Sequence, residues 1–199
     1  MTPEPIVPLA LFAVVATITP GGATTLAAAS GARFGFRRSL PLMTGIAVGL
    51  ASLAAAGGAG LATVLLGAPT LQIAMKLIGS LYLLWLAWNI GRSGPPDFRR
   101  DLADPTSFIG GACLLWLNPK GWAMALGAAA SFTALADSPL KLSALLAFAF
   151  GIAAIASLSL WCVGGLLLAR LLRTERQWRA VNAALGLLLV ASIIPMWRD

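Results

Sequence analysis

The sequence contains no histidine, and its seven acidic residues all lie outside the long apolar stretches (Glu4, Asp97, Asp101, Asp104, Asp137, Glu175 and Asp199). Without histidine, the chain has no imidazole to relay protons near neutral pH and no histidine ligand for a metal ion. No nucleophile stands beside a base in a pattern typical of an enzyme. The sequence therefore predicts no catalytic residues, no metal site and no cofactor.

Charged residues of either sign are scarce. They make up 11% of the chain, whereas an average soluble domain has about 25%, and 59% of the residues are hydrophobic. Apolar stretches of about 18 residues or more recur, each long enough to cross a bilayer as a helix. We therefore expect an all-α integral membrane protein in contact with lipid, and the net charge of +7 does not indicate a nucleic-acid partner. Cys113 and Cys162 lie in apolar segments and are expected to pack there.

Six transmembrane helices are expected from the apolar stretches. A basic loop follows the first helix, a short turn follows the second, and a polar segment with Pro95 and Pro96 follows the third. A basic connection over about residues 170–179 precedes the sixth helix. The expected helices span about residues 5–32, 40–66, 70–90, 108–134, 140–169 and 180–197.

Two of these helices contain residues that break a helix. The first carries Thr19-Pro20-Gly21-Gly22, and the fourth carries Asn118-Pro119-Lys120-Gly121. Proline removes a backbone donor and clashes with the carbonyl one turn back, and a lysine at the centre of a membrane span costs roughly 2.5–3.5 kcal/mol. We expect helices one and four to be broken near the midplane of the membrane. A proline kink that only bends each helix for packing is the alternative.

Lysine and arginine are distributed unevenly between the expected loops. Because cytoplasmic loops are enriched in these residues, the basic loops belong in the cytoplasm and both termini outside. One side would hold only Lys141 and Arg198. The other would hold Arg33, Arg37, Arg38, Arg92, Arg99, Arg100, Arg170, Arg173, Arg176 and Arg179.

This topology divides the single transporter domain, residues 1–199, into two halves of opposite orientation. Residues 1–92 form one three-helix half, residues 93–107 a cytoplasmic linker, and residues 108–199 the second half. Each half begins with a broken helix. Inverted repeats with broken helices at matching positions are typical of secondary transporters, whose binding site lies near the midplane.

The breaks are the predicted substrate-binding site. A half-helix that restarts after a break has unpaired N–H groups and a partial positive charge, which favour a carboxylate. The site residues would be Thr19, Pro20, Gly21 and Gly22 from the first half, and Asn118, Pro119 and Lys120 from the second. A lysine withdrawn from water can exchange its proton near neutral pH, so Lys120 is also a candidate proton carrier.

Two residues of the third helix are further candidates. Lys76 lies about 9 Å into the helix at 1.5 Å per residue, where it either joins the substrate pathway or extends its ammonium group to the outer surface. Tyr82 either faces the cavity or packs in the bundle. Because no acid lies within a span to pair with a cationic side chain, a neutral substrate is favoured.

These residues resemble the LysE/RhtB family of bacterial amino-acid exporters. The similar pieces are Thr19-Pro20-Gly21, the run from Gly31 to Gly35, Gly45 and Gly49, the helix from Leu71 to Trp88, and Phe108 through Lys120. The family usually continues Thr-Pro-Gly-Pro, and Gly22 replaces the second proline here. The resemblance implies a multi-pass protein of the bacterial inner membrane that exports amino acids, is driven by protons and forms a homo-oligomer, expected to be a dimer.

The leading hypothesis is therefore a secondary exporter of a small amino acid or similar zwitterion, working by alternating access. An inorganic-ion or metal permease of related architecture is an alternative, although a cation site would want acids, histidines or clustered cysteines in the spans. A membrane scaffold without transport is the other alternative, and it would not need Lys120 at mid-depth.

Overall fold

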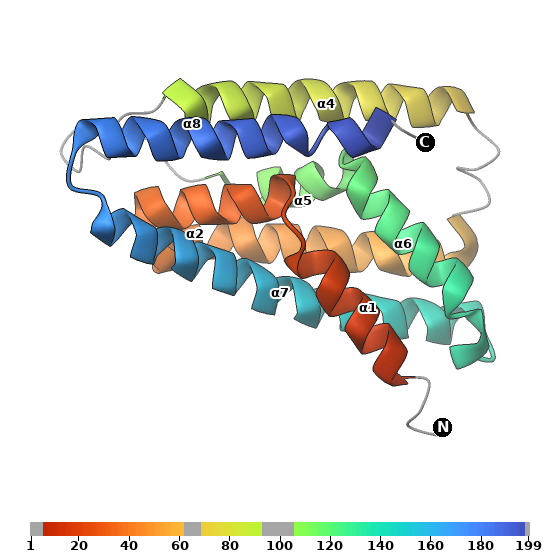
Figure 1. Ribbon diagram of the computed structural model, residues 1–199. Helices are drawn as coiled ribbons and strands as arrows, with labels where there is room; N and C mark the ends of the chain where they lie inside the picture. The colour runs from red at the N-terminus through yellow and green to blue at the C-terminus, as the bar shows by residue number, and fades with distance from the viewer. Residues whose placement is uncertain (1–5, 62–68, 93–105, 198–199) are drawn as a thin grey trace.

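The computed structural model describes residues 6–61, 69–92 and 106–197, and within these residues it is all-helical (Figure 1). The end of the expected second helix, the turn after it, residues 93–105 of the linker, and Arg99, Arg100 and Arg198 lie outside the described residues. The described α-helices are α1 (Ile6–Ile18), α2 (Gly22–Ala56), α4 (Pro69–Arg92), α5 (Phe108–Trp116), α6 (Pro119–Ser131), α7 (Pro139–Leu171) and α8 (Glu175–Ala191).

Helix α2 combines the second part of the expected first helix with the expected second helix. Its two segments, residues 22–34 and 36–56, run in opposite directions on either side of Gly35, whose φ is +77° (Figure 1). The hydroxyls of Ser30 and Ser39 lie 2.7 Å apart, whereas nine residues of continuous helix would separate them by about 13.5 Å. The expected basic loop over residues 33–39 is therefore wrong in extent, because one glycine with positive φ suffices to reverse the chain.

The other boundaries follow local capping. Asn118 caps α6 and Ser138 caps α7, and a proline occupies the first turn of each helix. The expected basic connection over residues 170–179 is wrong, because α8 already begins at Glu175. There Thr174 and Gln177 form a capping box: Gln177 N donates to Thr174 Oγ1 at 3.2 Å, and Thr174 N donates to Gln177 Oε1 at 3.0 Å. Helix α8 ends at Ala191, before a short 3₁₀ turn at Ile194–Trp197.

The core lies where α2 packs against α7 and α5. A Cβ atom on Gly45 would overlap the carbonyl oxygen of Phe108, and one on Gly49 would come within 2.9 Å of the carbonyl oxygen of Ala112. Gly45 and Gly49 therefore let these helices approach closely. Gly31 and Gly165 do the same between the first segment of α2 and α7.

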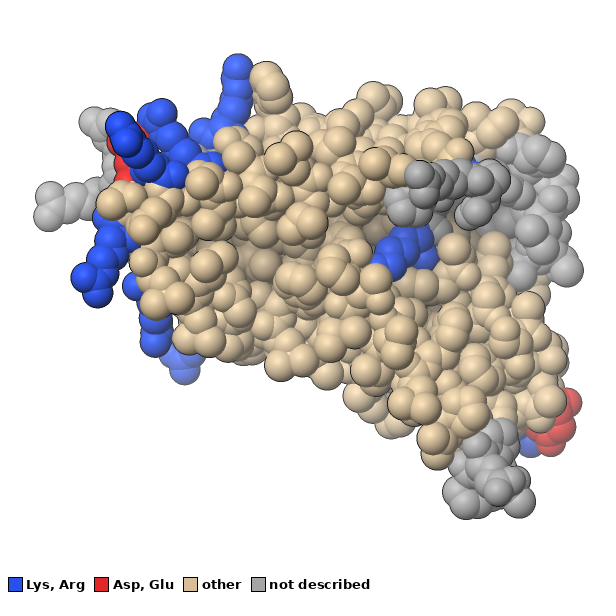
Figure 2. Space-filling view, in the orientation of Figure 1, with Lys and Arg blue, Asp and Glu red and all other residues tan. Residues whose placement is uncertain are grey.

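The outer surface is largely apolar. Leu140 is 80% exposed and Ile109 is 71% exposed, which suits contact with lipid rather than water. Figure 2 shows Lys and Arg side chains gathered at one end of the molecule, with an almost uncharged surface over most of the visible face. The turn of α2, the end of α7 and the start of α8 meet at that end (Figure 1), and we call it the arginine end.

Two described helical segments meet the length and hydropathy expected of a membrane span. They are Gly22–Gly60, with mean hydropathy 1.7, and Pro139–Leu171, with mean hydropathy 2.2. The first is folded back on itself at Gly35. The shorter apolar helix α1 covers Ile6–Ile18.

Candidate functional site

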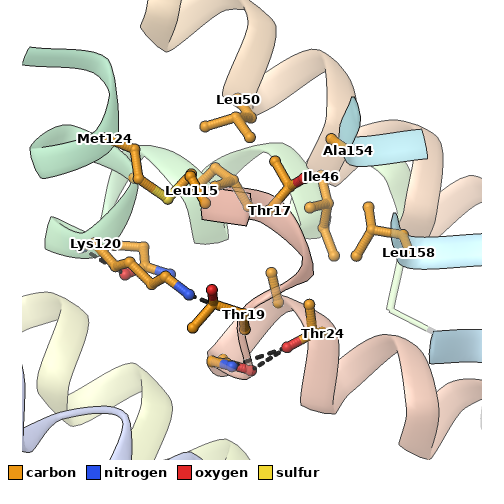
Figure 3. Close-up of a pocket in the computed structure, with 16 residues that line it drawn as sticks. Thr17, Thr19, Thr24, Ile46, Leu50, Leu115, Lys120, Met124, Ala154 and Leu158 are labelled. Carbon is orange, nitrogen blue, oxygen red and sulfur yellow. Dashed lines mark hydrogen bonds between the residues drawn. The ribbon is translucent and has the colours of Figure 1, made fainter. Parts of the chain in front are cut away.

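A small cavity of about 40 Å³ lies where the two helix breaks meet (Figure 3). Thr19, Gly21 and Gly22 line it from the first break, and Asn118, Lys120 and Gly121 line it from the second. Apolar side chains of α2, α5, α6 and α7 close the remaining walls, among them Ile46, Leu50, Leu115, Met124 and Leu158.

The first break covers Thr19, Pro20 and Gly21, between the end of α1 and the start of α2. Thr19 Oγ1 donates to Val15 O at 2.5 Å, which holds the last turn of α1. The N–H of Gly21 donates to Thr24 Oγ1 at 2.8 Å, so Thr24 supports the start of α2 from within the helix. Both half-helix ends at this break are therefore ordered by local hydroxyl groups.

Side chains from distant helices satisfy the carbonyl groups at the end of α1. Ser157 Oγ donates to Thr17 O at 2.8 Å, and Trp161 Nε1 donates to Ile18 O at 3.1 Å, both from α7. The last four carbonyl groups of a helix have no partner within it and carry a partial negative charge. Helix α7 therefore holds α1 in the position that leaves its C-terminal end facing the second break.

Lys120 completes this arrangement from α6. Its Nζ donates to Thr19 O at 2.9 Å and to Pro20 O at 3.5 Å (Figure 3). A Cβ atom on Gly21 would lie 3.1 Å from this Nζ and 3.4 Å from the Cδ atom of Lys120. Gly21 therefore leaves the room through which the lysine side chain crosses from one break to the other.

The second break has a different internal order. Asn118 Oδ1 accepts a hydrogen bond from Lys120 N at 3.0 Å, and Pro119 contributes no N–H, so the side-chain oxygen of Asn118 caps α6. Trp122 Nε1 donates to Trp116 O at 2.8 Å, and the two indoles meet edge to face at 5.4 Å. Trp116 and Trp122 are absent from the cavity lining and hold the end of α5 in place.

The structure brings together most of the site residues expected from sequence. Thr19, Gly21, Gly22, Asn118 and Lys120 line one cavity, and Pro20 takes part through its carbonyl oxygen. Pro119 begins α6.

The two candidates on α4 are not among the residues that line this cavity. Lys76 is half-buried in the first half of that helix. Tyr82 stacks on Trp85, with ring centroids 5.9 Å apart.

Sequence reasoning missed Ser157, Trp161 and Thr24. Ser157 and Trp161 are four residues apart and so share one face of α7, a pattern that was visible but is common in any helix. Their partners lie more than 130 residues earlier in the chain, so only the packing of α7 against α1 reveals their role. Thr24 lies three residues after Gly21, a spacing at which a hydroxyl can support the start of a helix, so its role could have been recognised from the sequence.

Nothing in the described ranges points to a metal centre. No group of three or more His, Cys, Asp or Glu side chains is close enough there to hold a metal ion. No observation in the described part of the chain therefore favours the ion-permease alternative over transport of an organic substrate.

Comparison with known proteins assigns the architecture to a family. The family model described as LysE type translocator matches residues 14–192. A cysteine/O-acetylserine efflux protein of Escherichia coli K12 is 28% identical over 193 residues, which cover 96% of each chain. A protein of the same name from Klebsiella pneumoniae is 30% identical over 121 residues, covering 60% of this chain and 61% of that protein. No solved structure gives a significant match.

Proposed function

This chain belongs to the LysE type translocator family, and on that premise we propose that it exports a small neutral amino acid across the bacterial inner membrane. The relatives are named as efflux proteins for cysteine and O-acetylserine, two zwitterions with small uncharged side chains. All acidic residues of this chain lie outside the apolar segments, so a cationic substrate side chain would meet no counter-charge. Cysteine and O-acetylserine are therefore the first substrates to test.

The observation that carries this proposal is the contact of Lys120 Nζ with Thr19 O at 2.9 Å. A substrate carboxylate would attract the lysine away from the carbonyl oxygens of the first break. The first N–H groups of α2, at Gly22 and Ala23, lie in the cavity wall and have no partner within the helix. They would supply further donors to the carboxylate.

A zwitterion would also use the carbonyl groups that the lysine releases. Thr19 O and Pro20 O, at the negative end of α1, would accept hydrogen bonds from the substrate ammonium. The same exchange would break the bond that joins the two halves. Substrate binding would thus release a contact between helices 101 residues apart in the chain.

The size of the cavity supports a conformational cycle. A volume of about 40 Å³ has room for about two or three water molecules, whereas small-molecule sites occupy about 300–1,000 Å³. The cavity must open before an amino acid can enter. We propose that alternating access opens it, with Lys120 acting as the latch and protons as the coupling ion.

The packing of the helices supports an inverted repeat. Helix α1 packs on α7, α5 packs on the second segment of α2, and α4 packs on α8. A serine takes part in the hydrogen bonds at the end of each short helix: Ser157 of α7 donates to Thr17 O, and Ser52 of α2 accepts from Trp116 Nε1 at 3.0 Å. The two bonds differ in kind, but each serine belongs to the helix on which the short helix packs, as two related halves would produce.

The proposed orientation places the arginine end in the cytoplasm. Ile6, where α1 begins, and Trp197, where the final 3₁₀ turn ends, lie toward the opposite end (Figure 1). Both termini would then be periplasmic. Self-association as a dimer is proposed from the family resemblance alone.

Transport by everted membrane vesicles tests the function. Export appears there as uptake, measured with labelled cysteine, O-acetylserine, alanine and lysine, with and without a pH gradient. We expect uptake of the small neutral compounds, abolished when the gradient is collapsed, and little uptake of lysine. Uptake of lysine at an equal rate would overturn the assignment of a neutral substrate, and uptake that survives collapse of the gradient would overturn proton coupling.

A further inference from the structure

A second, larger cavity is separate from the cavity that Lys120 lines. It has a volume of about 560 Å³ and is lined only by apolar residues, from the end of α1, the first segment of α2, α7 and α8. A Cβ atom added to Gly164 in its wall would have no heavy atom within 4 Å. The cavity is therefore an open groove on the apolar surface, and it is not a void left between packed side chains.

The groove extends over about one third of the thickness of the bilayer core. Trp161 lies at its deep end, where the indole donates to Ile18 O beside the first break. Leu168 lies seven residues further along α7, about 10.5 Å at 1.5 Å per residue. One leaflet of a hydrocarbon core of about 30 Å is about 15 Å deep. The groove therefore fits within a single leaflet and spans about two thirds of its depth.

The shallow end of the groove opens toward the arginine end. Beyond Leu168, α7 continues to Arg170, and Arg173 follows in the connection to α8. Both arginine side chains are exposed. At about 100° of rotation per residue, Arg170 lies on the face of α7 opposite the groove-lining residues, so Arg173 is the candidate at the mouth of the groove. Figure 2 shows the concentration of basic side chains at this end. An apolar slot thus leads directly to a cluster of cationic side chains at the membrane surface.

We propose that this groove binds one acyl chain of an anionic phospholipid, whose phosphate contacts Arg173. The apolar lining matches the chain, and the exposed guanidinium group matches the phosphate, which it binds through two parallel hydrogen bonds. A second copy of the protein seated in this groove fits less well, because like charges would repel at its mouth. The dimer proposed above would therefore use another face.

Lipid retention on the purified full-length protein tests this proposal. Native mass spectrometry counts the lipids retained after incubation with phosphatidylglycerol or with phosphatidylcholine of the same acyl chains. We expect phosphatidylglycerol to be retained several-fold more than phosphatidylcholine, because only the former carries a net negative charge. Equal retention of the two lipids would overturn the proposal.

Substitutions locate the bound lipid. Gly164→Phe fills the groove without an overlap at Cβ and should reduce retention of phosphatidylglycerol by more than half. Ile152→Phe adds bulk to the same helix at a position 56% exposed and absent from the groove lining, and should leave retention unchanged. The variant Arg173→Gln should remove the preference for phosphatidylglycerol and keep the weaker binding of phosphatidylcholine, whereas Arg170→Gln, on the opposite face of α7, should leave the preference in place.

Two results would contradict this location. Unchanged retention in Gly164→Phe would show that the lipid binds elsewhere. A change of oligomer mass in Gly164→Phe, with lipid retention unaltered, would make the groove an interface between copies of the chain instead.

Discussion

Lys120 Nζ and Thr19 O lie 2.9 Å apart although 101 residues separate them in the chain. The lysine stands in the first turn of α6, and the carbonyl follows the end of α1. One helix break thus supplies a cation and the other supplies the partial negative charge of a helix C-terminus. This hydrogen bond joins the two breaks directly at the cavity.

Replacing this lysine should abolish transport. Lys120→Met keeps the length of the side chain and removes both the charge and the bond to Thr19 O. Charge-assisted hydrogen bonds are worth roughly 1.5–3 kcal/mol, so substrate affinity should fall about tenfold to a hundredfold in vesicle uptake. Lys120→Arg should restore activity only in part, because a guanidinium differs in shape from an ammonium group and stays charged, so it cannot carry a proton.

Lys76→Met is the matched control for Lys120→Met. Lys76 is absent from the cavity lining, so this variant should transport almost normally. Both variants should be monodisperse on size-exclusion chromatography. Normal uptake by a well-folded Lys120→Met protein would remove the lysine from the mechanism.

Ser157→Ala should destabilise the protein without changing what it binds. The buried hydroxyl donates to Thr17 O at 2.8 Å, and a buried acceptor left without its donor costs about 1–3 kcal/mol. We expect a lower thermal unfolding midpoint in detergent and an unchanged order of substrate preference. Ser192→Ala is a suitable control, because that hydroxyl bonds only within its own turn, to Leu189 O. A change in substrate order in Ser157→Ala would instead place this hydroxyl in the binding site.

Gly22→Pro should fold. Gly22 is the first residue of α2, the helical position that proline favours. A Cβ atom there would come within 2.8 Å of Leu83 Cδ2, the end of a flexible side chain that can rotate away. Expression and monodispersity should match the parent protein, whereas substrate range should shift because Gly22 lines the cavity and proline removes its N–H, one of the proposed donors to the carboxylate. Loss of membrane insertion would place the break elsewhere.

Gly35→Ala should impair folding. Gly35 has φ +77° and ψ 173°, a region that is essentially restricted to glycine and costs about 1–3 kcal/mol for other residues. We expect a lower unfolding midpoint and less protein in the membrane. Gly164→Ala is the control, since neither backbone conformation nor space opposes a Cβ atom there. Equal stability of the two variants would argue against the tight turn.

The membrane orientation is tested by reporter fusions. Fusions after Arg38, Arg100 and Arg176 should report the cytoplasm, and fusions after Ala68 and Asp137 should report the periplasm, because arginines concentrate in the first set of segments. A periplasmic signal at Arg100 would contradict the opposite orientation of the two halves.

The sequence by itself determined the class of the protein, the approximate position of the apolar segments, and both helix breaks. These depend on local composition: proline and glycine act on their own backbone, and hydropathy acts over a single span. The pieces from Thr19-Pro20-Gly21 to Asn118-Pro119-Lys120 also carried the family resemblance, which the match over residues 14–192 confirmed. The cap at Thr174 could also have been recognised from the sequence, but the basic residues around it favoured a longer connection before the last helix.

Only the tertiary structure decided what each break contacts. Lys120 was expected to bind a substrate carboxylate, whereas in the structure its Nζ donates a hydrogen bond to the carbonyl oxygen of Thr19 at the first break. Ser157 and Trp161 gained their role from the packing of α7 on α1, and Asn118 was used as a cap. Hydrogen bonds between segments more than a hundred residues apart depend on how helices approach one another. That approach is set by close packing at positions such as Gly31 and Gly45, and no local pattern in one sequence encodes the partner.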